Sequence, residues 1–458
     1  MRMRTSFHPE DFTPDIRQAE TPPMLKQASE VNAQDASTER GAAKPAAGGM
    51  LHPFKVRNFM LLFGGQMISV LGDALYAVAL PWLILNNGGS AEALGMVLAA
   101  YGIPRVGSML LGGWLADRLR PRRVMLLADL VRALLVGILA ALALGGHPTV
   151  LQLCAVAVPL GAFGGAFLPA SMAIMPDILS DDDLQAGNAL NLASMQAALL
   201  VGSALAGVVV AAFTAGAGLA IDAVTFIVSA VSLAMMRAAH VATSRKREAG
   251  ESRENPQAST HEQEAQVSFW HFLRTSRLIQ VVLLVALAAG FCFGGLLAVA
   301  LPTLVHGPLH GGASDYGAIL AGWGAGALGG GILAGTLGKL KHKGLLMLGD
   351  GLLLAASMAL LPNWGVPGAV VLMLIGGVAN SVTTVLLFTV VHLVIPRHLL
   401  GRVMGLLMFS SFGTYPLSVA LVGVLSNQFG PAILFPFSGL LLALVMLFGM
   451  TQRVAREF

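Results

Sequence analysis

The sequence contains twelve apolar stretches, each long enough to cross a lipid bilayer as an α-helix. A hydrocarbon core of about 30 Å requires about 20 apolar residues in helical form. Charged residues make up only 11% of the 458 residues, too few to cover the surface of a soluble protein of this length. We therefore predict an all-α polytopic membrane protein, with spans at approximately 58–85, 92–115, 123–145, 149–175, 188–213, 217–237, 277–305, 315–337, 344–362, 366–391, 402–426 and 431–450.

Polar stretches divide the chain into parts. Residues 1–52 are rich in Pro, Ala, Glu and Gln and lack a helical period, which predicts a disordered cytoplasmic tail without a cleavable signal peptide. Residues 240–272 are predicted to form a cytoplasmic linker with six spans on either side. We therefore expect an N-terminal bundle over 53–239, a C-terminal bundle over 273–452 and a cytoplasmic C-tail over 453–458.

The basic residues are confined to alternate loops. Apart from Arg105 and Arg132, which lie well inside spans, every Lys and Arg falls in a tail, in an even-numbered loop or at the end of a span that borders such a loop. Loops rich in Lys and Arg stay in the cytoplasm. This pattern predicts a multi-pass protein of the inner membrane with both termini in the cytoplasm. The net charge of +4 is then explained by topology, and we expect no nucleic-acid partner.

The two halves of the chain align at a constant offset of 221 residues. The segment Ala77–Pro81 is identical to Ala298–Pro302, and Asp129 aligns with Asp350. Three arginines before Asp129 align with three lysines: Arg118, Arg120 and Arg122 with Lys339, Lys341 and Lys343. Because each half has an even number of spans, both halves enter the membrane in the same orientation. The sequence predicts parallel repeats related by a pseudo-two-fold axis, with a site near the midplane where they meet.

One loop carries a family resemblance. The segment Gly113–Arg123 reads Gly-Trp-Leu-Ala-Asp-Arg-Leu-Arg-Pro-Arg-Arg and resembles the loop 2–3 motif of the major facilitator superfamily. Other segments are similar to the drug:proton antiporter branch that includes macrolide and siderophore exporters: Leu71–Asp73, Phe167–Ala170, Met175–Asp177, Leu184–Leu190, Asp222–Phe226 and Gly401–Gly405.

The resemblance implies a monomeric secondary transporter that works by alternating access in the lipid bilayer. Its partners would be protons and a small apolar or amphipathic substrate, which the protein would export. A siderophore or lysophospholipid transporter is the alternative within this class. A non-transporting membrane sensor is the alternative from another class.

The resemblance also implies a cytoplasmic gate. Asp117 would pair with the N-terminal end of helix 11 near Gly401 and Arg402, where the helix dipole is positive. Gly113, Arg118 and Arg122 belong to the same motif, although arginines at a membrane edge also serve topology alone. In the second half Gly338 replaces the aspartate. The antiporters' helix-5 motif is degenerate, because Gly202–Gly207 has lost its proline and one glycine.

Charged residues inside the spans are the candidate coupling residues. Asp73 and Arg105 both fall near the midplane, where each charge costs about 2.5–3.5 kcal/mol on insertion scales. We expect them to form either a proton-titrating or substrate-facing pair, or a static ion pair between helices 1 and 2. If conformational change moved Arg105 toward or away from Asp73, the proton affinity of the site would switch.

The remaining candidates lie nearer the membrane surfaces. Asp129 and Arg132 are three residues apart on helix 3 and are predicted to form a local structural pair. Asp350 lacks an arginine three residues on, so its expected partner is one of the lysines at 339, 341 and 343. Asp222, near the outer end of helix 6, is predicted to belong to a gate or an interface.

Motifs for cofactors and catalysis are missing from the sequence. Gly324, Gly326 and Gly329 match a dinucleotide fingerprint in form, but they lie inside an apolar span without a preceding strand, which favours close helix packing. We find no nucleotide-binding loop, nucleophile–base set or His spacing for a metal. We therefore predict a protein that is not an enzyme and has no cofactor.

Overall fold

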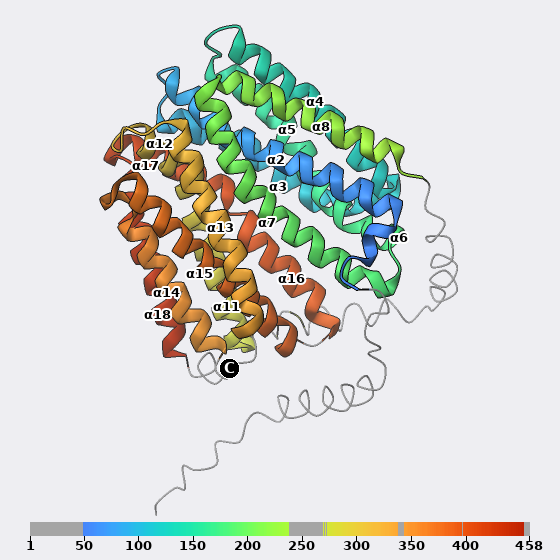
Figure 1. Cartoon of the computed structure of the whole chain (residues 1–458). Coiled ribbons are helices and arrows are strands. Elements are labelled where there is room, and N and C mark those ends of the chain that lie inside the picture. The colour runs from blue at the N-terminus through green and yellow to red at the C-terminus, as the bar shows by residue number, and fades with distance from the viewer. Residues whose placement is uncertain are drawn as a thin grey trace, which may run out of the picture. The chain divides into compact units, whose positions relative to one another are not determined.

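The computed structural model describes residues 49–237, 269, 271, 273–337, 343–395 and 397–452 (Figure 1). The predicted tail up to residue 48, the linker over 240–268 and the predicted C-tail lie outside the described residues. The arrangement below concerns the described part of the chain.

The first half consists of six long helices. A short 3₁₀ turn, η1 (His52–Lys55), precedes them, and a short helix, α6 (Met175–Ile178), separates the fourth from the fifth. The long helices are α2 (Arg57–Asn86), α3 (Ala91–Leu119), α4 (Pro121–Leu144), α5 (Val150–Ala173), α7 (Asp181–Ala212) and α8 (Ala215–Met235). Polar caps start three of them, because Ser90, Thr149 and Thr214 each accept a backbone N–H three residues on.

The second half repeats the pattern with two interrupted passes. The first pass is α11 (Arg277–Gly295), a π-helical turn η2 (Leu296–Ala300) and α12 (Leu301–His306). The next three are α13 (Ala313–Leu337), α14 (Lys343–Leu360), which ends in the turn η3 (Leu361–Asn363), and α15 (Gly365–Val394). The last two are α16 (Arg397–Phe412) with α17 (Tyr415–Phe429), and α18 (Leu434–Thr451).

These elements confirm the predicted twelve-helix fold in two six-helix bundles. Among the described residues, eleven of the passes are both long and apolar enough to cross a membrane. The twelfth is α3, whose 29 residues extend about 43 Å. The span predicted as one helix over 402–426 is divided between α16 and α17, because Pro416 stands in the first turn of α17 and cannot continue the preceding helix.

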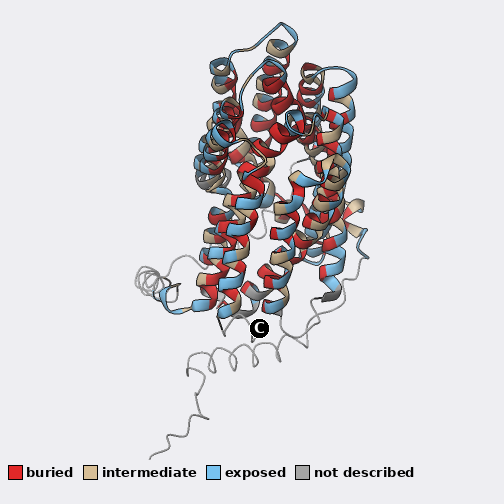
Figure 2. Ribbon diagram, turned by 90° about the vertical axis from the view of Figure 1, so that its left-hand side faces the viewer, coloured by how far each residue is buried: buried red, intermediate tan, exposed pale blue. Residues whose placement is uncertain are grey.

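The same helix pairs pack in both halves. In the first half α2 packs against α7 and α8, α3 against α5, and α4 against α8 and α5. In the second half α13 packs against α15, and α14 against α15 and α18. The two largest interfaces between the halves are α7 with α13 and α17 with α3, and the repeat relates one to the other. Buried residues gather on the faces that the helices turn toward one another (Figure 2).

Glycines allow the helix backbones to approach closely at both of these interfaces. A Cβ atom on Gly207 of α7 would lie 3.0 Å from the Cα of Gly317 on α13, and one on Gly95 of α3 would lie 3.0 Å from the Cα of Gly423 on α17. At such crossings the helix backbones touch, and only glycine fits. Gly207 belongs to the degenerate helix-5 motif, so the structure gives this residue a packing role.

The glycine period of α13 also packs as predicted. Cβ atoms on Gly322, Gly326 and Gly330 would each lie 2.0–2.7 Å from a backbone carbonyl oxygen of α15. Within that motif Gly324 instead faces Leu200 of α7. Two of the three glycines of the formal dinucleotide fingerprint, Gly324 and Gly326, therefore pack against helices, whereas Gly329 is exposed.

We expect Gly207→Val to destabilise the contact between α7 and α13. Overpacking of a tight crossing costs about 1–3 kcal/mol, and the nearest atoms here are backbone, which cannot rotate away. Thermal unfolding of the purified protein in detergent measures the loss. Gly329→Val is the matched control, because a Cβ on this exposed glycine of α13 meets no atom within 4 Å. Equal unfolding temperatures for the two variants would contradict the assignment.

Candidate functional site

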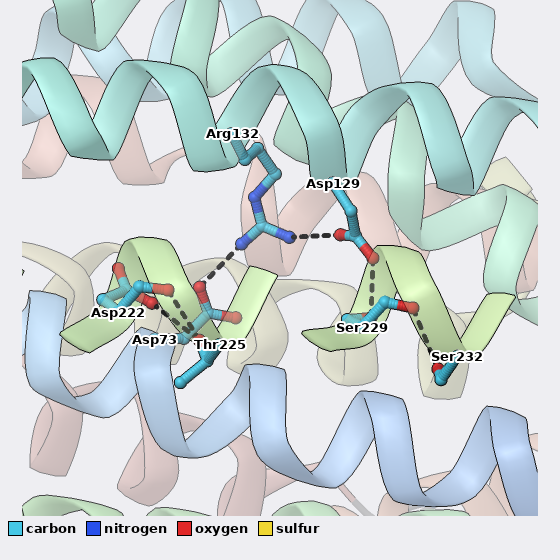
Figure 3. A network of polar contacts seen from close by, with 7 residues as sticks. All are labelled: Asp73, Asp129, Arg132, Asp222, Thr225, Ser229 and Ser232. Atoms are coloured by element: carbon cyan, nitrogen blue, oxygen red, sulfur yellow. Dashed lines mark hydrogen bonds and ion pairs between the residues drawn. The ribbon is translucent and has the colours of Figure 1, made fainter. Parts of the chain in front are cut away.

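A buried guanidinium lies at the centre of a polar network inside the first bundle (Figure 3). Arg132 comes from α4, and only 9% of its side chain is exposed. Its Nη2 donates a hydrogen bond of 2.6 Å to Oδ1 of Asp73 on α2, and its Nη1 lies 3.7 Å from Oδ1 of Asp129. The guanidinium also lies over the ring of Phe226, 3.9 Å from the centroid. Arg132 thus joins α4 to α2 and packs on α8.

Asp129 is fully enclosed on its side of the network. Its side chain has no exposed surface, and its Oδ2 accepts a hydrogen bond of 2.6 Å from the hydroxyl of Ser229 on α8. Asp129 and Arg132 lie one helical turn apart, so the predicted local pair is confirmed. Ser229 was not anticipated from the sequence, because nothing local marks it as a partner of α4.

Asp73 has a buried side and an open side. Its carboxylate is bonded to the buried Arg132, yet 46% of its side chain is exposed. The structure thus corrects the predicted partner, since Asp73 pairs with Arg132 and not with Arg105. The predicted pair of Asp73 with Arg105 required α2 and α3 to pack closely, because these helices follow each other in the sequence. In the structure α2 packs mainly on α7 and α8 and little on α3.

Asp222 of α8 lies beside this network in the interior of the first bundle. Its side chain is completely buried. Its Oδ1 accepts from the hydroxyl of Thr225, whereas its Oδ2 has no hydrogen-bond partner among the described residues. Gly72 makes room for it, because a Cβ there would lie 2.3 Å from Asp222 Oδ1. The network therefore holds three carboxylates and one guanidinium.

Arg105 lies apart from these carboxylates. It is half-buried near the middle of α3, with its guanidinium 5.5 Å from the ring centroid of Tyr101. It forms no ion pair with any carboxylate in the described part of the chain. The ring of Tyr101 in turn lies 6.3 Å from that of Tyr76 on α2.

The second bundle retains little of this polarity. Asp350 on α14, the repeat counterpart of Asp129, accepts a hydrogen bond of 3.0 Å from the hydroxyl of Thr383 on α15. Its predicted lysine partners lie outside the residues whose side chains are described. At the offset of 221 residues, Asp73, Arg105, Arg132 and Asp222 correspond to Gly294, Gly326, Leu353 and Ala443.

The residues of the predicted cytoplasmic gate are only partly visible. Gly113 and Asp117 lie on α3, and their side chains are outside the described part. Arg118, Gly401 and Arg402 are exposed. Arg122 donates from Nε to the carbonyl oxygen of Leu233 and from Nη2 to that of Ala234, both at 2.8 Å. Arg122 therefore caps the C-terminus of α8 within the first bundle.

The opposite ends of the helices carry contacts that were missed in the sequence. Oδ1 of Asn86 on α2 lies 3.1 Å from Nε2 of His306 on α12. Trp82 stacks on Tyr316 of α13 with ring centroids 6.1 Å apart. Asn427 on α17 donates to Glu92 on α3 at 3.3 Å. These contacts tie the halves together at one end, and only the three-dimensional arrangement reveals them.

The chain is a polytopic membrane protein of two six-helix bundles. The bundles are related by an internal repeat, and the first of them encloses buried charged residues. The model of the Major Facilitator Superfamily matches residues 62–415, and the chain belongs to that superfamily. The structure of a peptide transporter POT in complex with sulfate has a TM-score of 0.67 at 15% identity, with 91% of this chain and 97% of that chain covered. A D-xylose-proton symporter has a TM-score of 0.65 at 13% identity, covering 86% and 95%.

Curated relatives are exporters by name. The chain is 30% identical to the multidrug efflux pump Tap of Mycobacterium tuberculosis over 187 residues, which are 39% of this chain and 44% of Tap. The chain thus matches less than half the length of Tap. It is 25% identical to the enterobactin exporter EntS of Citrobacter koseri over 395 residues, which are 84% of this chain and 89% of EntS.

Proposed function

We propose that this protein is a secondary active transporter that exports small apolar or amphipathic molecules in exchange for protons. The observation that carries the proposal is the network around Arg132, where two carboxylates contact one guanidinium and the buried carboxylate of Asp222 lies beside them. With all four groups ionised, the site has a net charge of −2, and two of its three carboxylates, Asp129 and Asp222, are fully buried. Uncompensated buried charge is costly, and proton binding relieves it.

The open side of Asp73 gives this network a route for proton exchange. In alternating access the exposed carboxylate faces one side of the membrane and then the other. When Arg132 is bonded to Asp73, the guanidinium neutralises the carboxylate. When the contact breaks, Asp73 binds a proton instead. Coupling of transport to the proton gradient then depends on the 2.6 Å hydrogen bond between Arg132 and Asp73, which forms and breaks as the conformation changes.

The relatives guide the choice of substrate. Their names indicate multidrug efflux for Tap and enterobactin export for EntS. EntS is matched over most of both chains, which favours siderophore export as the second candidate. Lysophospholipid transport rests on the sequence resemblance alone. We propose no enzymatic activity for the chain, and a monomer as the working unit.

Transport by the purified protein in liposomes tests the proposal. A lumen one pH unit more acidic than the bath supplies about 1.4 kcal/mol per proton. A one-for-one exchanger should therefore accumulate substrate in the lumen about tenfold, and an uncoupler should abolish the accumulation. Equal uptake with and without the gradient, across drugs and siderophores, would reject proton-coupled export and favour the non-transporting sensor.

The orientation in the membrane is a separate proposal. We place both termini and the linker in the cytoplasm of a multi-pass inner-membrane protein, and we assign to Asp117 a gate contact with the N-terminal end of α16. A Cys introduced at Ser252 in the linker should be shielded from an impermeant thiol reagent in intact cells, whereas a Cys at Ser90 should react. Equal labelling of the two positions would overturn the assigned topology.

A further inference from the structure

We propose that Arg105 and the tyrosines around it form a binding site for the negatively charged end of an aromatic substrate. The inference rests on the proposed transport function, which leaves the charge of the substrate open. It assigns a second role to the charged residues of the membrane interior: the network around Arg132 takes the proton, and Arg105 takes the substrate.

The first observation is that Arg105 has no acidic partner. Its charge lies in the middle of α3, where an uncompensated cation is costly unless it faces water or a ligand. Arg132, by comparison, contacts two carboxylates. No carboxylate in the described part of the chain neutralises Arg105, and the ring of Tyr101 lies beside it. An anion supplied by a substrate would complete the site.

The second observation is an unused hydroxyl on the neighbouring helix α2. The hydroxyl of Tyr76 is buried and has no hydrogen-bond partner among the described residues. A buried donor without a partner costs about 1–3 kcal/mol, so a ligand atom that accepts its hydrogen bond is favoured. Tyr76 and Tyr101 approach each other across the gap between α2 and α3. Their rings and Arg105 together offer a cation, a free donor and two aromatic surfaces.

The third observation is that both halves contribute to this place. Tyr415 of α17 packs between them, because Cβ atoms on Gly102 of α3 and Gly294 of α11 would each lie 3.1 Å from its ring. Gly102 lies three residues before Arg105 on α3, so Tyr415 packs within about one helical turn of this arginine. Tyr101 and Tyr415 thus lie near this arginine, and Tyr76 lies next to Tyr101. A ligand bound there touches both halves, as alternating access requires.

In the proposed site the rest of the ligand lies against the second bundle, which forms an apolar wall because it lacks the charges of the first. Gly294 and Gly326 stand where the first bundle has Asp73 and Arg105. Next to Gly294, the ring of Phe293 lies 5.6 Å from that of Trp323 on α13. An arginine beside tyrosine rings, opposite an uncharged bundle, suits a molecule with an anionic group at one end and an aromatic ring system at the other.

Three naphthalene compounds of equal ring size test the proposal: 2-naphthoate, 2-naphthamide and 2-naphthylmethylamine, which are anionic, neutral and cationic. Binding to the full chain in detergent is measured by equilibrium dialysis without a pH gradient. We expect wild type to bind 2-naphthoate about tenfold more tightly than 2-naphthamide, because hydrogen bonds to charged groups are among the stronger ones. Arg105→Gln should remove this preference, and Arg105→Lys should retain part of it.

Two controls separate a lost site from a damaged fold. Unchanged binding of 2-naphthamide by Arg105→Gln shows that the apolar wall is intact. Arg57→Gln, which changes an exposed arginine at the start of α2, should bind all three compounds as wild type does. Tyr76→Phe should weaken binding of 2-naphthoate without affecting the amide. The proposal is overturned if Arg105→Gln keeps the preference for 2-naphthoate, or if wild type prefers the amine.

This result is independent of the test for transport. If wild type binds 2-naphthoate through Arg105 but the liposomes show no proton-driven accumulation of any compound, the proposed function fails and the binding site stands. If the liposomes accumulate 2-naphthylmethylamine and binding prefers this cation, transport stands and the anion site is rejected.

Discussion

Asp73→Asn is expected to abolish proton-driven accumulation while leaving substrate exchange at equilibrium intact. The amide has nearly the shape of the carboxylate and still accepts the hydrogen bond from Arg132, but it cannot gain or lose a proton in the working range. The gradient then has no group through which to act. In liposomes with an acidic lumen, the roughly tenfold accumulation expected for wild type should fall to the equilibrium level. Counterflow of labelled substrate without a gradient should continue.

Asp182→Asn is the matched control for this experiment. Asp182 lies exposed in the first turn of α7, outside the network, so its variant should accumulate substrate as wild type does. If Asp73→Asn accumulates substrate normally with an unchanged response to pH, the coupling proton is carried elsewhere. Asp129, Asp222 and Asp350 are then tested in that order.

The largest expected loss of stability comes from Arg132→Leu. Removal of one partner from a buried ion pair costs about 3–5 kcal/mol, because the remaining charge is left uncompensated. Asp129 would keep only the hydroxyl of Ser229, and Asp222 would lose its nearby cation. We expect a marked fall in the unfolding temperature in detergent and a smaller yield of monodisperse protein. Arg57→Gln should unfold as wild type does.

A second substitution separates the charge effect from the loss of packing on Phe226. Asp129→Asn in the Arg132→Leu background removes one uncompensated carboxylate and should restore part of the lost stability. If the charge were irrelevant, the double variant would be no more stable than Arg132→Leu. Wild-type stability of Arg132→Leu alone would show that the guanidinium does not hold the bundle together.

The fold was predictable because its signals are local. Span length, basic loops and the repeat each depend on short stretches of sequence, and the twelve passes agree with them. The same holds for Asp129 and Arg132, whose pairing follows from the helical period. The stripe of glycines on α13 was also predictable, because a period of four residues places small side chains on one face.

The site was less predictable because its contacts join distant segments. Asp73 was paired with Arg105 on the next helix, whereas its real partner lies 59 residues away on α4. Ser229 is 100 residues from Asp129, and His306 is 220 residues from Asn86. No local pattern distinguishes these residues from other polar residues in apolar spans. The partners of these residues depend on which helices pack together, and a single sequence does not specify that packing.

The unequal placement of charge between the two bundles has a consequence for how such a protein can change over evolutionary time. In α11–α18, Asp350 is the only carboxylate that lies away from a helix end. Substitutions in the second bundle therefore reshape the apolar wall without disturbing Arg132 and its carboxylates. Such a protein can acquire new cargo through one half of its chain while the other half keeps the machinery that uses the gradient. Selection can then act on cargo range and energy conversion as separate traits.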